Sequence, residues 1–346
     1  MRGNPQDFPD KAPPDGGAFP FIYPPTAANI SFFSDALLQG GFVAIPTETV
    51  YGLAANALDP SAARSIFEIK GRPLVDPLIL HLPGPDAAAR LAFLPETFAK
   101  LAKAFWPGPL TLILRKKPLV PDIITAGKET VALRIPAHPV AQNLLKRVGC
   151  PLAAPSANPF GYVSPTTARH VTESFGSRIP FVLDGGDCQI GLESTILDLS
   201  QPGQECILRT GAISAEAIAE ILGRRPAYHE KSLSAGRPAT APGMFSRHYS
   251  PRTTLQLVGR MASVKAQPPE TALIFLQAPE GNNRHSAHQY WLSENGDPFQ
   301  MAHSLFSLLR QLDQAGYNRL VCEVPPPEAT GLLKALRDRL LRAASD

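Results

Sequence analysis

Short apolar runs alternate with helix-like stretches from Ser31 to about Leu222, and this alternation constrains the fold more than any other feature of the chain. A short apolar run between polar segments is typical of a buried strand, and strands that alternate with helices form an α/β sheet. The runs lie at residues 42–45, 78–80, 110–114, 131–133 and 181–183. They predict an α/β domain built around a sheet.

The 346-residue chain is long enough for two domains, and its composition changes where boundaries are expected. Residues 1–28 contain paired prolines and glycines without a helical or strand period, so we expect an extended N-terminal arm. Residues 223–252 are rich in proline, glycine and serine, which is typical of a linker. We therefore expect a first domain over residues 29–222 and a second over residues 253–346.

The second domain has strand candidates at residues 254–258, 271–276 and 320–324. Two amphipathic helices accompany them, because apolar residues recur at helical spacing in residues 301–312 and 332–341. This pattern predicts a smaller α/β, Rossmann-like domain. Its apolar stripes are expected to face the core, so no chemistry is assigned to them.

With 44% apolar residues, 18% charged residues and a mean hydropathy of -0.05, the chain has the composition of a globular protein. A net charge of +3 is too small for a dedicated nucleic-acid binder and suits a small, multiply charged anion. No apolar run approaches about 18 residues, so neither a membrane span nor a secretory signal is expected. The four cysteines lack the close spacing of a zinc site and are predicted to be reduced thiols of a cytoplasmic protein.

Residues 46–52, Pro-Thr-Glu-Thr-Val-Tyr-Gly, directly follow the first predicted strand. Ligands of α/β sheets tend to bind at strand ends, so the hydroxyl, carboxylate and phenol groups of this segment form a candidate pocket wall. A threonine-rich β-turn without a ligand explains the same residues equally well.

Lys70 and Arg72 flank a glycine at the predicted end of a helix that begins at Asp59 and Pro60. Lysine supplies a point charge and arginine a fork of donors, so two cations on one short turn suit a polyphosphate. The strand that follows ends at His81. A solvated helix end is the commoner explanation for such a pair taken alone.

Three further segments carry polar candidates. Arg134 is expected on the strand face opposite Leu133, where it would bind a carboxylate or phosphate, although a surface salt bridge is commoner. Ser156 and Asn158 lie among small residues that let a ligand approach closely, and they lack the Gly-x-Ser-x-Gly pattern of a hydrolase. Glycine-rich turns nearer residue 200 add Arg209 as another cation.

The chain contains neither Gly-x-x-x-x-Gly-Lys-[Ser/Thr] nor Gly-x-Gly-x-x-Gly, so a nucleotide site must be built from dispersed groups. Taken in order, the segments resemble the YrdC-like family, specifically its longer two-domain threonylcarbamoyl-AMP synthases. The resemblance covers residues 31–213 closely and continues through residues 242–244 and 248–251. Five unrelated motifs in matching order make it highly specific, whereas the C-terminal domain resembles its counterpart more weakly, mainly in the last helix.

The resemblance implies a twisted mixed sheet with a large concave cavity that binds L-threonine, bicarbonate and ATP. Lys70 and Arg72 are implied as catalytic residues that hold phosphates. The implied ATP-binding residues are Lys70, Arg72, Asp76, Thr130, Ser156, Asn158, Ser164, Arg209 and Tyr249. The implied threonine-binding residues are Thr49, His81, Arg134, Ala154 and Ser194. Tyr249 would reach from the linker onto the nucleotide, which makes the linker a lid.

Two positions depart from the family pattern. Ala54 replaces a glycine often found after Tyr-Gly-Leu, and Asp76 precedes Pro77 where many relatives have asparagine. A carboxylate repels phosphates unless it faces away or helps to hold a metal ion. Mg²⁺ is expected to neutralise the departing pyrophosphate, and no protein side chain is assigned to it.

The implied reaction needs no covalent enzyme intermediate. The neutral α-amine of threonine captures CO₂ from bicarbonate as a carbamate, whose oxygen attacks the α-phosphorus of ATP and expels pyrophosphate. Positioning and charge stabilisation dominate such transfers, which explains the cations and hydroxyls of the motifs. The product would pass to a tRNA threonylcarbamoyl transferase machinery for N6-threonylcarbamoyladenosine, with no direct requirement for tRNA.

Two other functions stay open at this point. An RNA-binding regulator on a related fold would bind RNA on a basic concave surface with a steep salt dependence and without ATP turnover. A sugar-phosphate lyase on a similar fold would need clustered acidic metal ligands, which the motifs do not supply.

Overall fold

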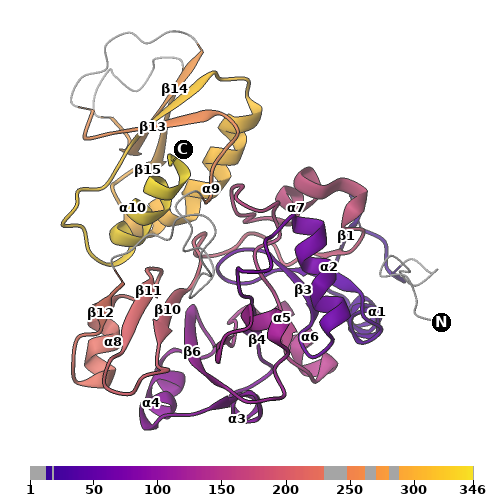
Figure 1. Cartoon of the computed structure of the whole chain (residues 1–346). Helices are drawn as coiled ribbons and strands as arrows, with labels where there is room; N and C mark the ends of the chain where they lie inside the picture. Colours follow the sequence, from indigo (N-terminus) through magenta and orange to yellow (C-terminus); the bar gives the residue numbers. More distant parts are fainter. Residues whose placement is uncertain (1–12, 18, 230–247, 262–269, 280–287, 346) are drawn as a thin grey trace.

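The computed structural model describes residues 13–17, 19–229, 248–261, 270–279 and 288–345, which form two α/β domains (Figure 1). Within them, the first domain has a mixed sheet in the order β1-β9-β2-β3-β8-β4-β7-β6-β10-β11-β12, with β5 paired to β6. Its strands are β1 (Ile22–Tyr23), β2 (Phe42–Ile45), β3 (Gly52–Asn56), β4 (Ile79–His81), β5 (Ala92–Phe93), β6 (Leu110–Lys116), β7 (Thr130–Arg134), β8 (Leu152–Ala153), β9 (Val182–Leu183), β10 (Thr195–Asp198), β11 (Cys206–Arg209) and β12 (Ala227–Tyr228). The predicted α/β class with a twisted mixed sheet is confirmed.

The helices of the first domain lie between these strands in the chain. They are α1 (Ala27–Leu38), α2 (Pro60–Lys70), α3 (Asp86–Leu91), α4 (Glu96–Phe105), α5 (Asp122–Thr125), α6 (Pro139–Val148), α7 (Ala168–Phe175) and α8 (Ala215–Leu222), with a 3₁₀ turn at Gly176–Arg178. Helix α2 begins and ends as the sequence predicts: the Asp59 carboxylate accepts hydrogen bonds from two backbone amides of the first turn, and Gly71 takes a left-handed φ of 61°. The left-handed Gly71 therefore fixes the direction in which the chain leaves α2 toward Arg72.

Side chains alternate along the strands, and this alternation decides which layer each residue joins. Val43 and Ile45 of β2 pack with Phe33 of α1 and Leu144 of α6 on one face of the sheet. Ala44, between them, belongs to the larger core on the other face, which includes α2, α4 and α7. The sheet is thus covered on both faces near β2.

The same alternation places polar side chains of β4 and β7 on the face of the sheet opposite the larger core. Leu80 and Leu133 join the larger core. Their neighbours His81 and Arg134 are paired in register and point to the opposite face, as expected for Arg134. Two polar side chains therefore stand side by side because the backbones of two strands are hydrogen-bonded.

The second domain has four parallel strands in the order β13-β16-β14-β15, which agrees with the predicted α/β class. They are β13 (Thr254–Val258), β14 (Thr271–Gln277), β15 (Gln289–Ser293) and β16 (Arg319–Glu323), with helices α9 (Pro298–Gln314) and α10 (Gly331–Ala343). The predicted apolar stripes face the core, since Leu305, Leu309, Leu336 and Leu340 are buried in one cluster.

The two domains are in close contact through α9. The buried guanidinium of Arg310 donates hydrogen bonds to the carbonyl oxygens of Val163, Ser164 and His170 in the first domain. Gly191 lies against the same helix, where an added Cβ would be 2.6 Å from the Cα of His303. A larger residue at position 191 would therefore separate the domains.

The expected arm and the expected linker are each described only in part. Of the expected arm, residues 13–17 and 19–28 are described, and they include β1, which pairs with β9, and the first two residues of α1. Most of the expected linker, residues 230–247 with Pro242-Gly243-Met244, lies outside the described residues. In the described parts of the chain, no helix is both long and apolar enough to cross a membrane.

Candidate active site

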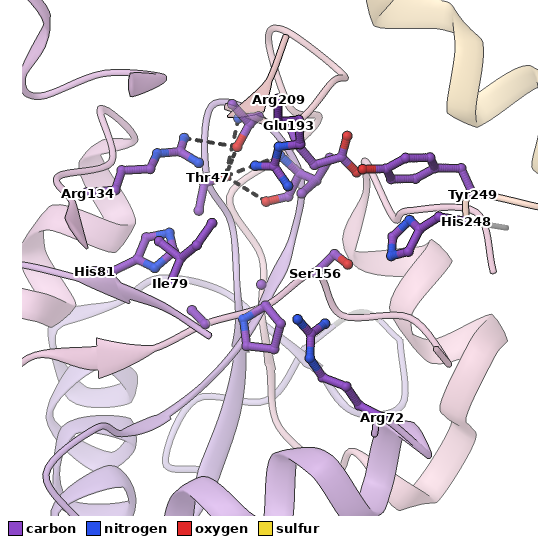
Figure 2. A pocket seen from close by; sticks show the side chains of 15 residues that line it. Thr47, Arg72, Ile79, His81, Arg134, Ser156, Glu193, Arg209, His248 and Tyr249 are labelled. Carbon is purple, nitrogen blue, oxygen red and sulfur yellow. Dashed lines mark hydrogen bonds between the residues drawn. The ribbon is translucent and has the colours of Figure 1, made fainter. Parts of the chain in front are cut away.

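A pocket of about 50 Å³ lies on the polar face of the sheet. Fifteen residues from separated segments line it: Thr47, Thr49, Val50, Gly52, Arg72, Ile79, His81, Arg134, Ala154, Pro155, Ser156, Glu193, Arg209, His248 and Tyr249. Figure 2 shows Arg134 and His81 on one side of this pocket and Arg72 on the other, with Ser156 and Tyr249 nearer to Arg72. We call these the Arg134 end and the Arg72 end.

At the Arg134 end, the arginine is paired with a carboxylate. Its Nη2 donates to Oε1 of Glu48 at 2.7 Å and to Oγ1 of Thr49 at 2.9 Å, and its Nε donates to the carbonyl oxygen of Gly108 at 3.3 Å. Oε2 of Glu48 accepts from the backbone amide of Ala137. Nη1 of Arg134 has no hydrogen-bond partner among the described residues, so it is available to a ligand.

His81 lies beside Arg134 as a neutral imidazole. Burial, followed by the positive charge of Arg134, lowers the pKa of His81 to about 3. Its Nδ1 is buried and finds no hydrogen-bond partner within the described residues. A neutral ring nitrogen in this position would hydrogen-bond to a ligand without adding charge.

At the Arg72 end, Lys70 lies behind the pocket wall. Its side chain is 3% exposed, and Nζ donates to the carbonyl oxygens of Ser156 and Asn158. Burial, followed by the charge of Arg72, holds the pKa of Lys70 well below its usual value. The two carbonyl groups fix the position of Nζ behind the Arg72 end of the pocket.

Arg72 is oriented by the turn that follows it. Its Nε donates to the carbonyl oxygen of Asp76 at 3.1 Å and its Nη2 to that of Pro77 at 2.8 Å. Nη1 is not hydrogen-bonded to any described residue, and the side chain points into the pocket (Figure 2). Backbone acceptors thus set the direction of this guanidinium.

The Asp76 carboxylate is 0% exposed and lies 2.9 Å from Nη2 of Arg72. The ion pair is close but poorly directed, because neither carboxylate oxygen accepts an aligned hydrogen bond from a described residue. Burial raises the pKa of Asp76, and the charge of Arg72 opposes that rise. The carboxylate therefore faces the cations of this end rather than away from them.

Between the two ends, residues 154–158 are fixed to the strand after the first polar turn. The amide of Leu53 donates to the carbonyl oxygen of Pro155, and that of Ala157 to the carbonyl oxygen of Tyr51. Ser156 lines the pocket in this arrangement, and its carbonyl group holds Lys70 from behind. The small residues predicted to allow close approach thus form one wall.

The far wall comes from residues near β10 and β11. Nε and Nη2 of Arg209 donate to the carbonyl oxygen and Oγ of Ser194, and that Oγ also lies 2.8 Å from Oγ1 of Thr111. Oγ of Ser164 donates to Oε1 of Glu193 at 2.6 Å. These contacts orient a third cation and a carboxylate at the pocket.

His248 and Tyr249, after the undescribed part of the linker, fill the space beside Arg72 and Ser156 (Figure 2). Tyr249 is buried and stacks on Phe306 of α9 with ring centroids 5.5 Å apart. The hydroxyl of Tyr249 and Nδ1 of His248 are buried and unpaired with any described residue. The pocket beside this segment has a volume of about 50 Å³.

Comparison with known proteins identifies the family. A model for Sua5, YciO and YrdC, described as "Telomere recombination", matches residues 35–211, and one described as "Threonylcarbamoyl-AMP synthase, C-terminal domain" matches residues 213–345. The chain belongs to the Sua5/YciO/YrdC family. Together the two models span both domains of the structure.

Relatives of similar length within the Sua5/YciO/YrdC family carry an enzyme name. The threonylcarbamoyl-AMP synthase of Pyrococcus abyssi is 40% identical over 317 residues, 88% of this chain and 91% of the relative. That of Bacillus subtilis is 37% identical over 324 residues, 89% and 90% of the two chains. A crystal structure titled P. abyssi Sua5 complexed with L-threonine aligns with a TM-score of 0.80 and 36% identity, covering 91% of this chain and 94% of that one.

Most residues implied by the family resemblance come together. Lining the pocket are Thr49, Arg72, His81, Arg134, Ala154, Ser156, Arg209 and Tyr249. Hydrogen-bonded or ion-paired to a lining residue are Lys70, Asp76, Asn158, Ser164 and Ser194. Thr130 instead lines a separate small hollow with Lys128 and Pro77, so its role in this Sua5/YciO/YrdC chain stays a prediction.

Seven lining residues were not among the candidates, and three of these have polar or charged side chains: Thr47, Glu193 and His248. Thr47 and Glu193 lie inside segments that were singled out, and His248 precedes Tyr249. Their residue types alone did not distinguish a ligand contact from loop structure. Only the geometry of the family fold places them on the cavity.

Proposed function

We propose that this chain forms threonylcarbamoyl-AMP and pyrophosphate from L-threonine, bicarbonate and ATP. The observation that carries the proposal is a single pocket with two different ends. Arg134 at one end can bind a carboxylate, and the turn with Lys70 and Arg72 at the other end is positively charged. Relatives that match both domains bear the name of this activity. The reaction is a nucleotidyl transfer, and its product serves the threonylcarbamoyladenosine modification of tRNA.

The Arg134 end suits the amino acid. Nη1 of Arg134 would hold the α-carboxylate of threonine, while Glu48 and Thr49 keep the guanidinium in place. The neutral Nδ1 of His81 would accept a hydrogen bond from threonine. Ala154 and Ser194 complete the proposed threonine side. A substrate carboxylate here leaves the α-amine directed toward the rest of the cavity.

The Arg72 end suits the triphosphate. Nη1 of Arg72 and the ammonium group of Lys70 would stabilise the negative charge that gathers on pyrophosphate as it departs. Polar groups around them would complete the nucleotide site, as we propose for Asp76, Thr130, Ser156, Asn158, Ser164, Arg209 and Tyr249. The carbamate oxygen then forms its bond to the α-phosphorus as the bond to pyrophosphate breaks.

Mg²⁺ fits this proposal as a companion of the triphosphate. Within the described residues, no group of three or more His, Cys, Asp or Glu side chains is arranged to hold a metal ion. The ion would therefore be bound mainly by phosphate oxygens, with Asp76 as the nearest buried carboxylate of the Arg72 end. It would supply charge neutralisation.

We further infer a cytoplasmic enzyme, since ATP is its substrate and tRNA carries the final modification. A separate tRNA threonylcarbamoyl transferase machinery would use the adenylate, and tRNA is not required for its formation. Within this proposal, residues 29–222 are the catalytic domain, 223–252 the linker and lid, and 253–346 the C-terminal domain. Residues 1–28 remain the expected arm, of which residues 1–12 and 18 lie outside the described residues.

The direct test incubates the purified chain with ATP, L-threonine and isotopically labelled bicarbonate. A labelled adenylate and equimolar pyrophosphate are expected only when all three substrates are present. Duplex RNA binding with a steep salt dependence and no adenylate would instead favour the RNA-binding alternative.

A further inference from the structure

A buried arginine of the C-terminal domain reaches the wall of the candidate active site. The side chain of Arg339, on α10, is 0% exposed. Its Nε donates to Oε2 of Glu193 at 2.8 Å, and its Nη2 donates to the carbonyl oxygen of Thr210 at 2.8 Å. Both partners belong to the first domain, and Glu193 lines the pocket. An ion pair between the domains therefore ends at the pocket wall.

The same guanidinium contacts the linker segment in the cavity. Its Cζ lies 5.2 Å from the centroid of the Tyr249 ring, which also stacks on Phe306 of α9. The backbone amide of His248 donates to the carbonyl oxygen of Arg342 at the end of α10. Residues 248 and 249 are thus packed against α9 and α10 of the C-terminal domain, and we call this the seated conformation.

The seated conformation needs such support. Tyr249 has a φ of 65°, in the left-handed region that bulky residues rarely adopt. Its hydroxyl is buried without a hydrogen-bond partner among the described residues, which is also unfavourable. Ring packing and the contact with Arg339 must offset both effects. Loss of Arg339 would therefore release the segment from the pocket more often.

We propose that Arg339 is a positioning residue, which seats Tyr249 over the nucleotide and holds Glu193 in the pocket wall. Glu193 uses its other carboxylate oxygen to accept from Ser164, a proposed nucleotide-binding residue, so one guanidinium reaches both the lid and the Arg72 end. The C-terminal domain then takes part in closing the site. This inference rests on the proposed function.

The test compares Arg339→Gln with Arg337→Gln on the same helix. Arg337 bonds to the carbonyl oxygen of Pro325 within the second domain and is the matched control. We expect Arg339→Gln to lower kcat for adenylate formation about tenfold, in line with a lost buried ion pair and cation–π contact. Threonine affinity, measured by calorimetry, should change less than about twofold. Arg337→Gln should match the wild type in both.

Hydrogen exchange separates seating from a merely structural role. The amide of Ser250 donates to the carbonyl oxygen of Gly161 at 2.8 Å, so its protection reports the seated segment. In Arg339→Gln its exchange should quicken about tenfold, while amides of β2 keep their protection. Arg339→Lys, which retains the charge but not the planar fork, should fall between the two.

Wild-type turnover together with wild-type Ser250 protection in Arg339→Gln would overturn the proposal. If that variant does not fold, Arg339→Lys decides: a reduced rate with faster Ser250 exchange supports seating, and unchanged values refute it. If the wild type makes no adenylate, the proposed function fails, while the exchange measurement still reports whether Arg339 seats the segment.

Discussion

The two ends of the pocket hold their arginines in different ways. At the Arg134 end, the guanidinium is paired with the buried Glu48 carboxylate and braced by Thr49. At the Arg72 end, Arg72 and Lys70 are held largely by backbone carbonyl oxygens, and the one carboxylate, Asp76, is poorly aligned. The first end is nearly balanced before any ligand binds, which suits one substrate carboxylate. The second retains excess positive charge, which suits a polyanion.

The largest effect should come from removing charge at the Arg72 end. Lys70→Ala is expected to lower kcat/KM for ATP by about 100-fold or more, as for loss of a preorganised charge stabiliser. Pyrophosphate release measures this, and threonine binding should survive because Arg134 is untouched. Lys100→Ala, an exposed lysine of α4, is the control. Wild-type pyrophosphate release by Lys70→Ala would break the comparison.

Acid sensitivity probes the Arg134 end. The pKa of His81 is about 3 in the folded chain and near 6.5 when unfolded, so between these values only the unfolded chain binds the proton. Its contribution to stability is therefore complete above about pH 6.5 and is lost as the pH falls toward 3. In His81→Gln, urea unfolding should show a shallower loss between pH 7 and pH 5, by up to about 1.4 kcal/mol per pH unit.

His229→Gln, at an exposed position, should reproduce the wild-type slope in the same titration. An identical slope for His81→Gln would mean that His81 is not held neutral by burial. His170, whose pKa burial lowers to about 4, contributes with the same sign and is present in all three proteins.

Arg134→Lys tests whether threonine binding needs the planar guanidinium group or only its positive charge. Lysine preserves the charge opposite Glu48, whereas alanine would leave a buried unpaired carboxylate at a cost of roughly 3–5 kcal/mol. An ammonium group cannot bond to Glu48, Thr49 and a substrate carboxylate with the same geometry. We expect KM for threonine to rise about tenfold with little change for ATP. An equal rise in both KM values would show that the two ends are not independent.

Asp76→Asn should have the smallest effect, a change in KM for ATP at the Arg72 end. The backbone acceptors of Arg72 remain, so the substitution mainly removes a negative charge from the Arg72 end. If Asp76 acts by repulsion, KM for ATP should fall about threefold, the size of a partly compensated charge interaction. Initial rates at varied ATP measure this. A rise in KM would instead indicate that the carboxylate helps to hold the metal ion of the triphosphate.

Much of the fold follows from local patterns. Residues 42–45 and 254–258 form strands with the expected bounds, and α2 has its predicted cap and glycine stop. Strand β3 was not expected, because Gly-Leu-Ala-Ala-Asn has neither β-branched residues nor clear alternation. It forms because β2 and β8 offer hydrogen-bonding edges on either side.

The candidate site, like the fold, was predictable from the sequence only in part. Short motifs and the family resemblance identified residue types that bind phosphates and carboxylates, and local rules placed Lys70 and Arg72 on one rigid turn. Whether a cation meets a carboxylate, as Arg134 meets Glu48, or only carbonyl groups, as Lys70 does, depends on residues 86 or more positions away.

The sequence by itself determined the α/β class, the two-domain organisation and the residue types of the pocket, because helix caps and strand alternation act over a few residues. Only the tertiary structure decided which charges are neutralised and that Arg339, 146 positions from Glu193, reaches the pocket wall. The physical reason is that burial and ion pairing depend on distances in space, which chain separation does not encode.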